Sequence, residues 1–296
     1  KLAGTGAEDI WVSTFHSGCA KILRRDIEKL GYTRSFTIYD DDDQMSALKE
    51  ILKKLNIDDK FLPPREIKSK ISDAKNKLLG PQDWFSQSER DYRSQLVYDV
   101  YQAYEEKLKS SNALDFDDLI VKTLELFAQH PPVLEAYQRK IRYIHVDEYQ
   151  DTNYAQYMLV RLLAAQSRNL CVVGDDDQSI YGWRGADIRN ILDFPKDFPG
   201  AKVYKLEQNY RSTTSILKAA NNVIKNNSNR NEKNLWSEIK DDNSIEYYEA
   251  YNDRDEATQV ARTINTLHRN GEKYSDMAVL VRANSVTRQF EEEFNL

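Results

Sequence analysis

The sequence predicts an α/β protein in which helices cover a parallel sheet, a long helical segment is inserted, and a second α/β unit follows. The sheet is indicated by short runs of β-forming residues that alternate with amphipathic helical patterns from residue 143 to residue 224. The insertion is indicated by residues from about 20 to 111, where apolar side chains recur only at helical spacing. After an Asn-rich stretch at 226–234, expected to be a loop, strand and helix patterns alternate again.

Composition restricts the class of protein. The chain has 296 residues, enough for two domains, and 30% of them are charged. No apolar run reaches the length of a membrane span and no leader pattern opens the sequence, so we expect a soluble, cytoplasmic protein without a membrane partner. The two cysteines, Cys19 and Cys171, indicate neither a disulfide framework nor a zinc site. Because the net charge is −6, contact with nucleic acid would need a local groove or patch.

The first predicted strand covers residues 10–14 and would deliver Thr14, Phe15 and His16 to a turn or a helix start. The preceding Gly4-Thr5-Gly6 is not a Walker A phosphate loop, because that motif needs a Lys after its last Gly and then a helix.

Two charged segments lie in the helical insertion. The aspartates at 40–43 lack the Gly and the terminal Glu of a calcium loop, and we expect them at a helix N-terminus. Between residues 60 and 77, six basic residues accompany only two acidic ones, which fits contact with a DNA backbone or, more simply, a solvated helix face. The basic residues are Lys60, Arg65, Lys68, Lys70, Lys75 and Lys77.

Beyond the insertion the elements alternate in the order expected for a parallel sheet, whose strand ends meet at one edge and bind ligands there. The predicted strands are 143–146, 170–173, 201–206, 244–250 and 277–281, and the predicted helices are 154–164, 215–224 and 255–267.

Asp147 and Glu148 directly follow the strand predicted at 143–146. In nucleotide hydrolases a carboxylate at such a strand end holds Mg²⁺, and a second carboxylate polarises the attacking water. Asp147 and Glu148 are our candidates for these two roles. The alternative for these residues alone is a polar strand end that caps the next helix.

The loop at 174–186 brings a second group of polar side chains to the same sheet edge. Gln178 can orient a water or sense a terminal phosphate, while Tyr181 and Trp183 can stack on unpaired bases beside Arg184. The alternative is a Gly-punctuated loop packed down by its own aromatic residues.

A third group follows the strand predicted at 201–206. Arg211 suits an arginine finger on a γ-phosphate, and Tyr210 can stack on a base. The alternative is a helix entry with Ser212 or Thr213 as N-cap, but capping does not explain Tyr210 and Arg211.

With these segments in hand, the sequence resembles the superfamily 1A DNA helicases of the UvrD/Rep/PcrA family, and looks closest to the members from Gram-positive bacteria. The order and spacing of the family's motifs fit, and the resemblance covers essentially the whole chain. The matching segments are residues 14–17 (motif Ib), 114–119 (a characteristic segment), 146–153 (motif II), 173–186 (motif III) and 206–212 (motif IV).

The resemblance implies a RecA-like parallel sheet, ATP and Mg²⁺ as cofactors, and single-stranded DNA or single/double-strand junctions as partners, with possible repair, replication or transcription proteins. It implies that residues 1–20 and 112–206 belong to RecA-like domain 1A, residues 21–111 to the helical insertion 1B, and residues 207–296 to the beginning of domain 2A.

The resemblance also implies a role for each candidate residue. Asp147 would bind Mg²⁺, Glu148 would activate water, and Gln178 would contact the γ-phosphate region and link it to DNA. Tyr210 would stack on adenine and Arg211 would contact the γ-phosphate. The residues implied to contact DNA are Thr14, Phe15, His16, Tyr181, Trp183 and Arg184.

The family's P-loop, motifs V and VI and the 2B insertion do not appear in this sequence. We therefore expect a fragment of an ATP-dependent 3′ to 5′ DNA helicase, in which ATP closes 1A on 2A, and we expect this chain alone to hydrolyse ATP poorly or not at all. Two alternatives stay open. One is a helicase-nuclease subunit of the AddA/RecB kind, and the other is a DNA-binding or protein-binding module without turnover.

Overall fold

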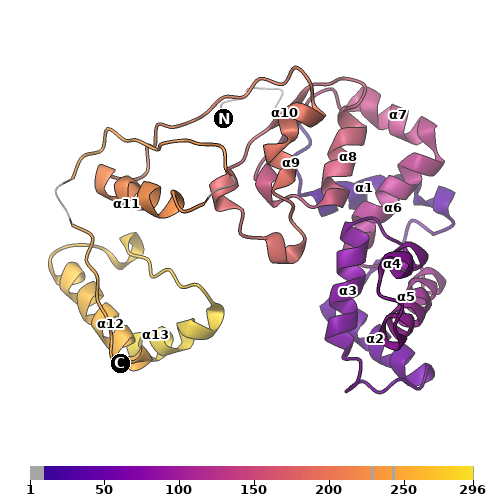
Figure 1. Ribbon diagram of the computed structural model, residues 1–296, viewed down its shortest axis with the longest axis horizontal. Helices are drawn as coiled ribbons and strands as arrows, with labels where there is room; N and C mark the ends of the chain where they lie inside the picture. Colours follow the sequence, from indigo (N-terminus) through magenta and orange to yellow (C-terminus); the bar gives the residue numbers. More distant parts are fainter. Residues whose placement is uncertain (1–9, 228–229, 242–243, 296) are drawn as a thin grey trace. The chain divides into compact units, whose positions relative to one another are not determined.

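The computed structural model describes residues 10–227, 230–241 and 244–295, and the chain divides into two compact units (Figure 1). Unit 1 comprises Lys1–Lys205 and Asn227–Lys233, and unit 2 comprises Leu206–Asn226 and Asn234–Leu296. Gly4-Thr5-Gly6, which we do not interpret as a phosphate loop, lies outside the described residues.

In its described residues, unit 1 is mainly helical, with two short parallel strand pairs. Its elements are α1 (Phe15–Asp26), η2 (Ile27–Leu30), β1 (Thr37–Ile38), α2 (Asp41–Lys54), α3 (Pro64–Asn76), α4 (Pro81–Gln87), α5 (Tyr92–Ser110), β2 (Ala113–Leu114), α6 (Phe116–Gln129), α7 (Pro131–Lys140), β3 (Ile144–Val146), η3 (Tyr149–Asp151), α8 (Tyr154–Ala164), β4 (Leu170–Val172), η4 (Asp176–Gln178), η5 (Gly182–Arg184), α9 (Arg189–Leu192) and α10 (Phe194–Asp197).

Local capping explains where several helices begin. The Thr14 hydroxyl accepts a hydrogen bond from the Ser17 amide and starts α1. Asp40 and Asp43 exchange hydrogen bonds in a capping box, so the aspartate run begins α2 as predicted. Asp115 and Asp118 form the same box at the start of α6.

Unit 1 contains two large apolar cores. One is shared by α1, η2, α6, α7 and α8, and includes Leu23, Ile27, Leu126 and Phe127. The other is shared by α2, α3 and α5, within the segment predicted as a helical insertion. Because helices α1 and η2 pack with α6 rather than with α2, residues 15–30 share a core with residues beyond 113.

A buried charge cluster joins the two cores. Lys75 on α3 is 2% exposed, and its ammonium lies 2.8 Å from Asp115, 2.7 Å from Asp118 and 2.8 Å from Glu105. Burial alone would lower the pKa of Lys75, but the three carboxylates raise it well above its ordinary value. Lys75 is therefore not part of a solvated basic face, contrary to the simpler sequence interpretation, because the acidic start of α6 requires a buried cation.

The strand pair that leads to the candidate site is β3 and β4. The two strands are parallel, with Ile144 opposite Leu170 and Val146 opposite Val172. Tyr149 and Tyr157, together with Val146 and Val160, bury one face of this pair. The strands predicted at 143–146 and 170–173 are thus confirmed, as is the helix predicted at 154–164.

Four other predicted strands are wrong. Residues 11–14 and 201–206 have no regular secondary structure, and none of the described residues in 244–250 and 277–281 forms a strand. A β-forming run becomes a strand only when another strand lies beside it to complete the hydrogen-bond ladder, and in the described structure β3 pairs with β4 alone. Residues 11–14 instead lead into α1, whose N-cap is Thr14.

Unit 2 contains α11 (Thr214–Ile224), α12 (Asp253–Arg269), η6 (Tyr274–Asp276), η7 (Asn284–Val286) and α13 (Thr287–Phe294), and α12 packs against α13. The helices predicted at 215–224 and 255–267 are confirmed. Among the described residues of unit 2, the buried apolar side chains are Leu217, Ala257 and Phe290. No helix of the described structure is both long and apolar enough to span a membrane.

Candidate functional site

The carboxylate site lies at the carboxyl ends of β3 and β4. The Val173 amide donates to the Val146 carbonyl at 2.8 Å, and the Tyr149 amide donates to the Val173 carbonyl at 2.9 Å. These two bonds hold the segment after β3 against the segment after β4. Asp147 and Glu148 therefore leave the sheet beside the loop that begins at Gly174.

Both candidate carboxylates are accessible. Asp147 and Glu148 are exposed, and no lysine or arginine of the described chain forms an ion pair with either. One oxygen of Asp147 accepts the Glu148 amide at 3.0 Å. Exposed carboxylate oxygens without a cationic partner suit Mg²⁺, which prefers oxygen ligands and retains several waters. The residues present therefore fit a magnesium ion held by Asp147.

Glu148 has an unusual backbone conformation. Its φ of 49° and ψ of 44° place it in the left-handed region, which a residue with a Cβ rarely adopts. This conformation costs on the order of 1 kcal/mol, and such strain concentrates at functional sites. It also turns the chain sharply after β3, between the strand and η3.

Gln150 connects the two loops. This side chain is 1% exposed, and its amide nitrogen donates to Glu148 Oε2 at 2.8 Å. Its amide oxygen accepts the Asp175 backbone N–H at 3.0 Å. One buried amide thus fixes the Glu148 carboxylate relative to the loop after β4.

The close approach of the Gln150 side chain also requires a glycine at position 174. A Cβ at this position would lie 2.5 Å from Gln150 Oε1 and 2.7 Å from Ile191 Cδ1. It would also lie 3.1 Å from the Tyr149 amide nitrogen. Only glycine lets the strand end approach the Gln150 side chain so closely.

The three aspartates after Gly174 are paired with cations from a distant part of the sequence. Lys233 forms an ion pair with Asp175 and lies 3.3 Å from Asp177, and Arg230 lies 3.2 Å from Asp177. Burial raises the pKa of Asp175, but hydrogen bonds from Lys233 and Gln178 outweigh it and bring the pKa below its ordinary value. Two cations thus neutralise part of the charge of three aspartates within unit 1.

Gln178 is exposed at the end of η4. Its side-chain amide donates to Asp175 Oδ2 at 2.7 Å. Since Asp175 also donates its backbone N–H to Gln150, a continuous chain of hydrogen bonds runs from Glu148 through Gln150 and Asp175 to Gln178. The structure thus connects Glu148 and Gln178, which the sequence placed on separate loops.

The rings predicted to stack on bases lie on the surface of the same loop. Trp183 is 71% exposed, and its ring centroid lies 6.5 Å from that of Tyr181. The Arg184 guanidinium lies 4.6 Å from the Trp183 centroid and 5.3 Å from the Tyr181 centroid. An exposed cation over two rings is a suitable surface for unpaired bases.

The other predicted DNA-contacting group lies at the start of α1. Thr14 is exposed at the N-cap, whereas Phe15 packs on the core. His16 is half-buried, its ring is edge-on to Phe116 at 6.0 Å, and burial lowers its pKa. His16 is thus neutral at physiological pH and offers a hydrogen bond rather than a charge.

Tyr210 and Arg211 belong to unit 2. The Asn209 side chain accepts the backbone amides of Arg211 and Ser212 and so shapes the turn before α11. Tyr210 is 77% exposed and its hydroxyl donates to Gln208 at 2.8 Å. Both predicted side chains are exposed to solvent.

Sequence reasoning missed Gln150, Arg230 and Lys233. Gln150 follows the carboxylate pair by two residues, so its position next to the candidate site was the available signal. Arg230 and Lys233 lie in the Asn-rich stretch that was expected only to be a loop, and nothing local indicates that they contact Asp177.

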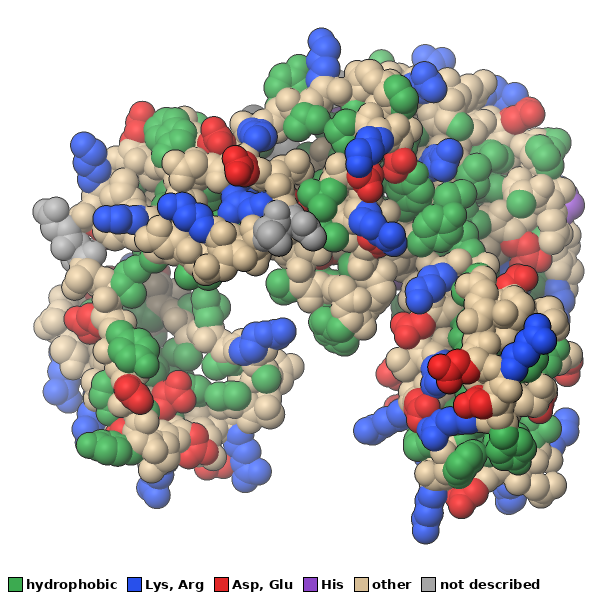
Figure 2. Space-filling view, viewed as in Figure 1, with side chains coloured by type: hydrophobic (Ala, Val, Ile, Leu, Met, Phe, Trp, Pro, Cys, Tyr) green, Lys and Arg blue, Asp and Glu red, His purple; other side chains and the backbone are tan. Residues whose placement is uncertain are grey.

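Lysine and arginine side chains are interspersed with aspartate and glutamate on the face shown in Figure 2. A parallel strand pair has exposed carboxylates at its carboxyl end, beside a loop that carries a glutamine and exposed rings. This arrangement defines an α/β protein with a candidate ligand site at a sheet edge.

Residues 1–199 match the model of the UvrD/REP helicase N-terminal domain, and residues 204–296 match the UvrD-like helicase C-terminal domain. The chain belongs to the UvrD/REP helicase family. The predicted family resemblance and the RecA-like α/β fold class are confirmed.

The chain is 57% identical over 295 residues to the ATP-dependent DNA helicase PcrA of Staphylococcus aureus, and 56% identical over 292 residues to PcrA of Bacillus subtilis. PcrA of Staphylococcus epidermidis is 55% identical over 293 residues. These alignments cover 98–99% of this chain but only 39–40% of the relatives. The chain therefore spans about two fifths of the length of the relatives it matches.

Proposed function

We propose that this chain is part of an ATP-dependent DNA helicase that moves 3′ to 5′ along single-stranded DNA. The observation that carries the proposal is the pair Asp147 and Glu148 at the end of β3, exposed and without a cationic partner among the described residues, with Glu148 fixed by Gln150. The printed names of the relatives, which are DNA helicases that depend on ATP, support it.

In this proposal each residue has a defined task. Asp147 would hold Mg²⁺, which when bound would neutralise charge on the phosphates. Glu148 accepts a proton from the attacking water, and Gln150 keeps the Glu148 carboxylate in one orientation. Tyr210 stacks on adenine and Arg211 stabilises charge on the γ-phosphate.

The proposal also assigns a route from nucleotide to DNA. Gln178 contacts the γ-phosphate region and is hydrogen-bonded to Asp175, which Gln150 joins to Glu148. The same loop continues to Tyr181, Trp183 and Arg184, which hold bases. Thr14, Phe15 and His16 contribute the second DNA contact, and junctions between single and double strands are the expected substrates.

The test is phosphate release from ATP by this chain and by a chain extended to the length of its relatives, each with and without single-stranded DNA. We expect ATP hydrolysis by the extended chain, stimulation of that hydrolysis by DNA, and little or no phosphate release by this chain alone.

In the extended chain, Glu148→Gln should lower the rate of hydrolysis at least about 10²-fold, because it removes a general base. If Glu148→Gln hydrolyses as fast as the parent, the role of Glu148 is wrong.

A second candidate is a DNA-binding module without turnover, which the exposed Tyr181, Trp183 and Arg184 cluster favours. Trp183→Ala should weaken binding of a labelled single-stranded oligonucleotide by about 1–3 kcal/mol, because it removes a stacking ring. Tyr92→Ala is the control, since Tyr92 is 73% exposed but lies in the helical insertion. Equal losses in both variants, measured by fluorescence anisotropy, would contradict the assignment of this loop.

A further inference from the structure

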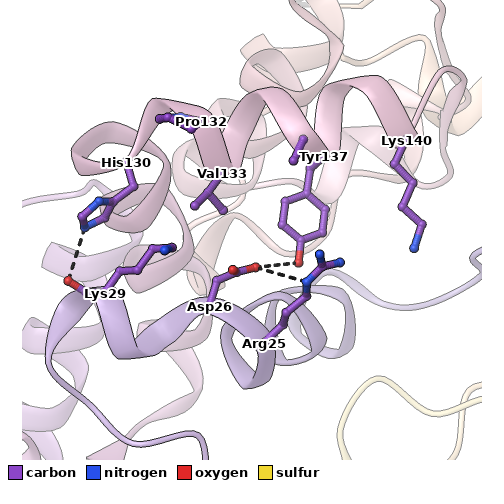
Figure 3. A pocket seen from close by; sticks show the side chains of 9 residues that line it. Arg25, Asp26, Lys29, His130, Pro132, Val133, Tyr137 and Lys140 are labelled. Atoms are coloured by element: carbon purple, nitrogen blue, oxygen red, sulfur yellow. Dashed lines mark hydrogen bonds and ion pairs between the residues drawn. The ribbon is translucent and has the colours of Figure 1, made fainter.

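A surface cavity of about 490 Å³ lies in unit 1 between the end of α1, η2 and helix α7 (Figure 3). Its volume falls within the range of ordinary ligand sites. None of its lining residues belongs to the carboxylate site or to the groups assigned to DNA, so the proposed function gives it no role.

The rim of this cavity is positively charged. Lys29 and His130 lie at one end and Arg25 and Lys140 toward the other (Figure 3). Within the described chain, neither Lys29 nor Lys140 lies within ion-pairing distance of a carboxylate. Unpaired cations on opposite sides of one cavity attract a ligand with separated negative charges.

The centre of the cavity is different. The buried side chains of Val133 and Tyr137 form its apolar part, beside Pro132 and Ala136. Asp26, the lining carboxylate, accepts the Tyr137 hydroxyl at 3.2 Å and lies 3.8 Å from Arg25. A negative charge at the centre would be repelled by Asp26, whereas an apolar group would be accommodated.

These features fit a peptide better than a nucleic acid. Tyr137 is 6% exposed and packs on Phe127 with ring centroids 5.9 Å apart, so its face is not available for stacking on a base. The first turn of α7 begins with Pro131 and Pro132, which have no N–H groups to offer a phosphate. The side chains on the rim are therefore the groups that would bind the negative charges of a ligand.

The spacing of the rim charges sets the length of the ligand. The His130 ring, at the N-cap of α7, lies 3.3 Å from the Lys29 carbonyl oxygen, and Lys140 is the last residue of that helix. The ten residues of α7, Pro131–Lys140, rise by roughly 15 Å from end to end at 1.5 Å per residue. An extended peptide covers that distance in about four or five residues. Carboxylates at that separation would reach Lys29 and Lys140 together, with an apolar side chain between them.

We propose that this cavity docks an acidic segment of a partner protein, with an apolar side chain on the exposed Pro132 and Ala136 and flanking carboxylates on Lys29 and Lys140. The probe is a fluorescein-labelled peptide with a central Leu-Phe pair flanked on both sides by glutamates, and the readout is fluorescence anisotropy with this chain. We expect saturable binding that weakens as salt is added, since exposed ion pairs are screened.

The variants locate the binding surface. The double variant Lys29→Glu and Lys140→Glu should weaken binding at least about tenfold, because it places like charges opposite the peptide carboxylates. Ala136→Glu, at an exposed position on the cavity wall, should do the same without touching the rim lysines. The control, Lys53→Glu with Lys54→Glu, makes the same charge change on exposed residues of α2 and should leave binding unchanged.

Several results would overturn the proposal. They are the absence of saturable binding, equal weakening by the control, and equal affinity for a peptide whose glutamates are replaced by glutamine. Binding of a single-stranded oligonucleotide that the rim variants reduce, with no effect on the peptide, would assign the cavity to nucleic acid instead. Circular dichroism of each variant verifies that the chain remains folded.

Discussion

At the scale of single residues, Gln150 and Gly174 explain how an exposed carboxylate keeps one orientation. Glu148 is exposed, and exposed side chains ordinarily sample several rotamers. Its contact with the buried Gln150 amide limits that freedom, and the amide itself is held by the Asp175 backbone. The missing Cβ of Gly174 leaves the space for this arrangement.

Gly174→Ala should therefore destabilise unit 1 by about 1–3 kcal/mol, because the added methyl group would overlap with Gln150 Oε1 and Ile191 Cδ1. The measurement is urea unfolding followed by circular dichroism. Gly182→Ala is the matched control, since a Cβ there meets nothing within 4 Å. If Gly174→Ala is as stable as Gly182→Ala, the Gln150 side chain can move away from the added methyl group without a loss of stability.

The sequence identified the residues at the carboxylate site but not the contacts among them. Asp147, Glu148 and Gln178 were predicted from their positions after strands, and the structure places them at the carboxyl ends of β3 and β4. The left-handed conformation of Glu148 and the buried state of Gln150 were not predictable, because both depend on the loop after β4. The assigned roles stay predictions.

At the scale of elements, the start of α6 is notable for its density of buried carboxylates. Asp115, the N-cap, and Asp118, in the first turn, are buried and form ion pairs with Lys75, and Asp117 in the same turn is half-buried. Burial, then the charge of Asp115, raises the pKa of Asp117 to about 6, while Ser72 and nearby lysines oppose the shift. Because this pKa lies above the ordinary 3.8, the folded chain binds that proton more tightly than the unfolded chain.

The contribution of Asp117 to stability should consequently be complete below pH 4 and be lost as pH rises to about 6. The shift corresponds to a change on the order of 3 kcal/mol. Asp117→Asn removes this dependence of stability on pH. The Asp117→Asn variant should therefore be more stable than the parent by about 1 kcal/mol or more at pH 7 and no more stable at pH 4.

Urea unfolding at both pH values measures the difference. Asp42→Asn is the control, because Asp42 occupies the same second helical position in α2 but is exposed. It should change the free energy of unfolding by less than about 0.5 kcal/mol. A stabilisation by Asp117→Asn that is the same at pH 4 and pH 7 would contradict the raised pKa.

Helices were predicted more reliably than strands. Helical periodicity and capping residues are local, so α2, α8, α11 and α12 could be placed from the sequence. A parallel strand depends on a partner far away in the sequence. The residues predicted as strands at 201–206 have no such partner in the described structure, and they run without regular secondary structure.

At the scale of the whole molecule, the two units differ in how much apolar surface they bury. Unit 1 has two large cores and a third beneath β3 and β4, whereas Leu217, Ala257 and Phe290 are the buried apolar residues among those described in unit 2. Burial of apolar surface is the main favourable contribution to folding. Unit 2 should open at a lower free-energy cost than unit 1.

Limited proteolysis with thermolysin should therefore cut unit 2 first and leave most of Lys1–Lys205 intact, as determined by mass spectrometry over time. Digestion in urea is the control, because both units should then be cut at similar rates. Early cleavage within α5 or α6, before α12, would contradict the ranking of the two units.

The ion pairs of Asp175 and Asp177 determine how unit 1 can be expressed separately from unit 2. The chain passes between the units three times, after Lys205, Asn226 and Lys233. A stop codon after Lys205 would not release unit 1 as a module, because it would also delete Arg230 and Lys233 and leave the loop after β4 with unneutralised aspartates. An independent unit 1 has to be made by excising residues 206–226, joining the flanks with a linker, and ending the chain after Lys233. Each unit is therefore built from two separate stretches of the sequence, and a stretch of the other unit lies between them.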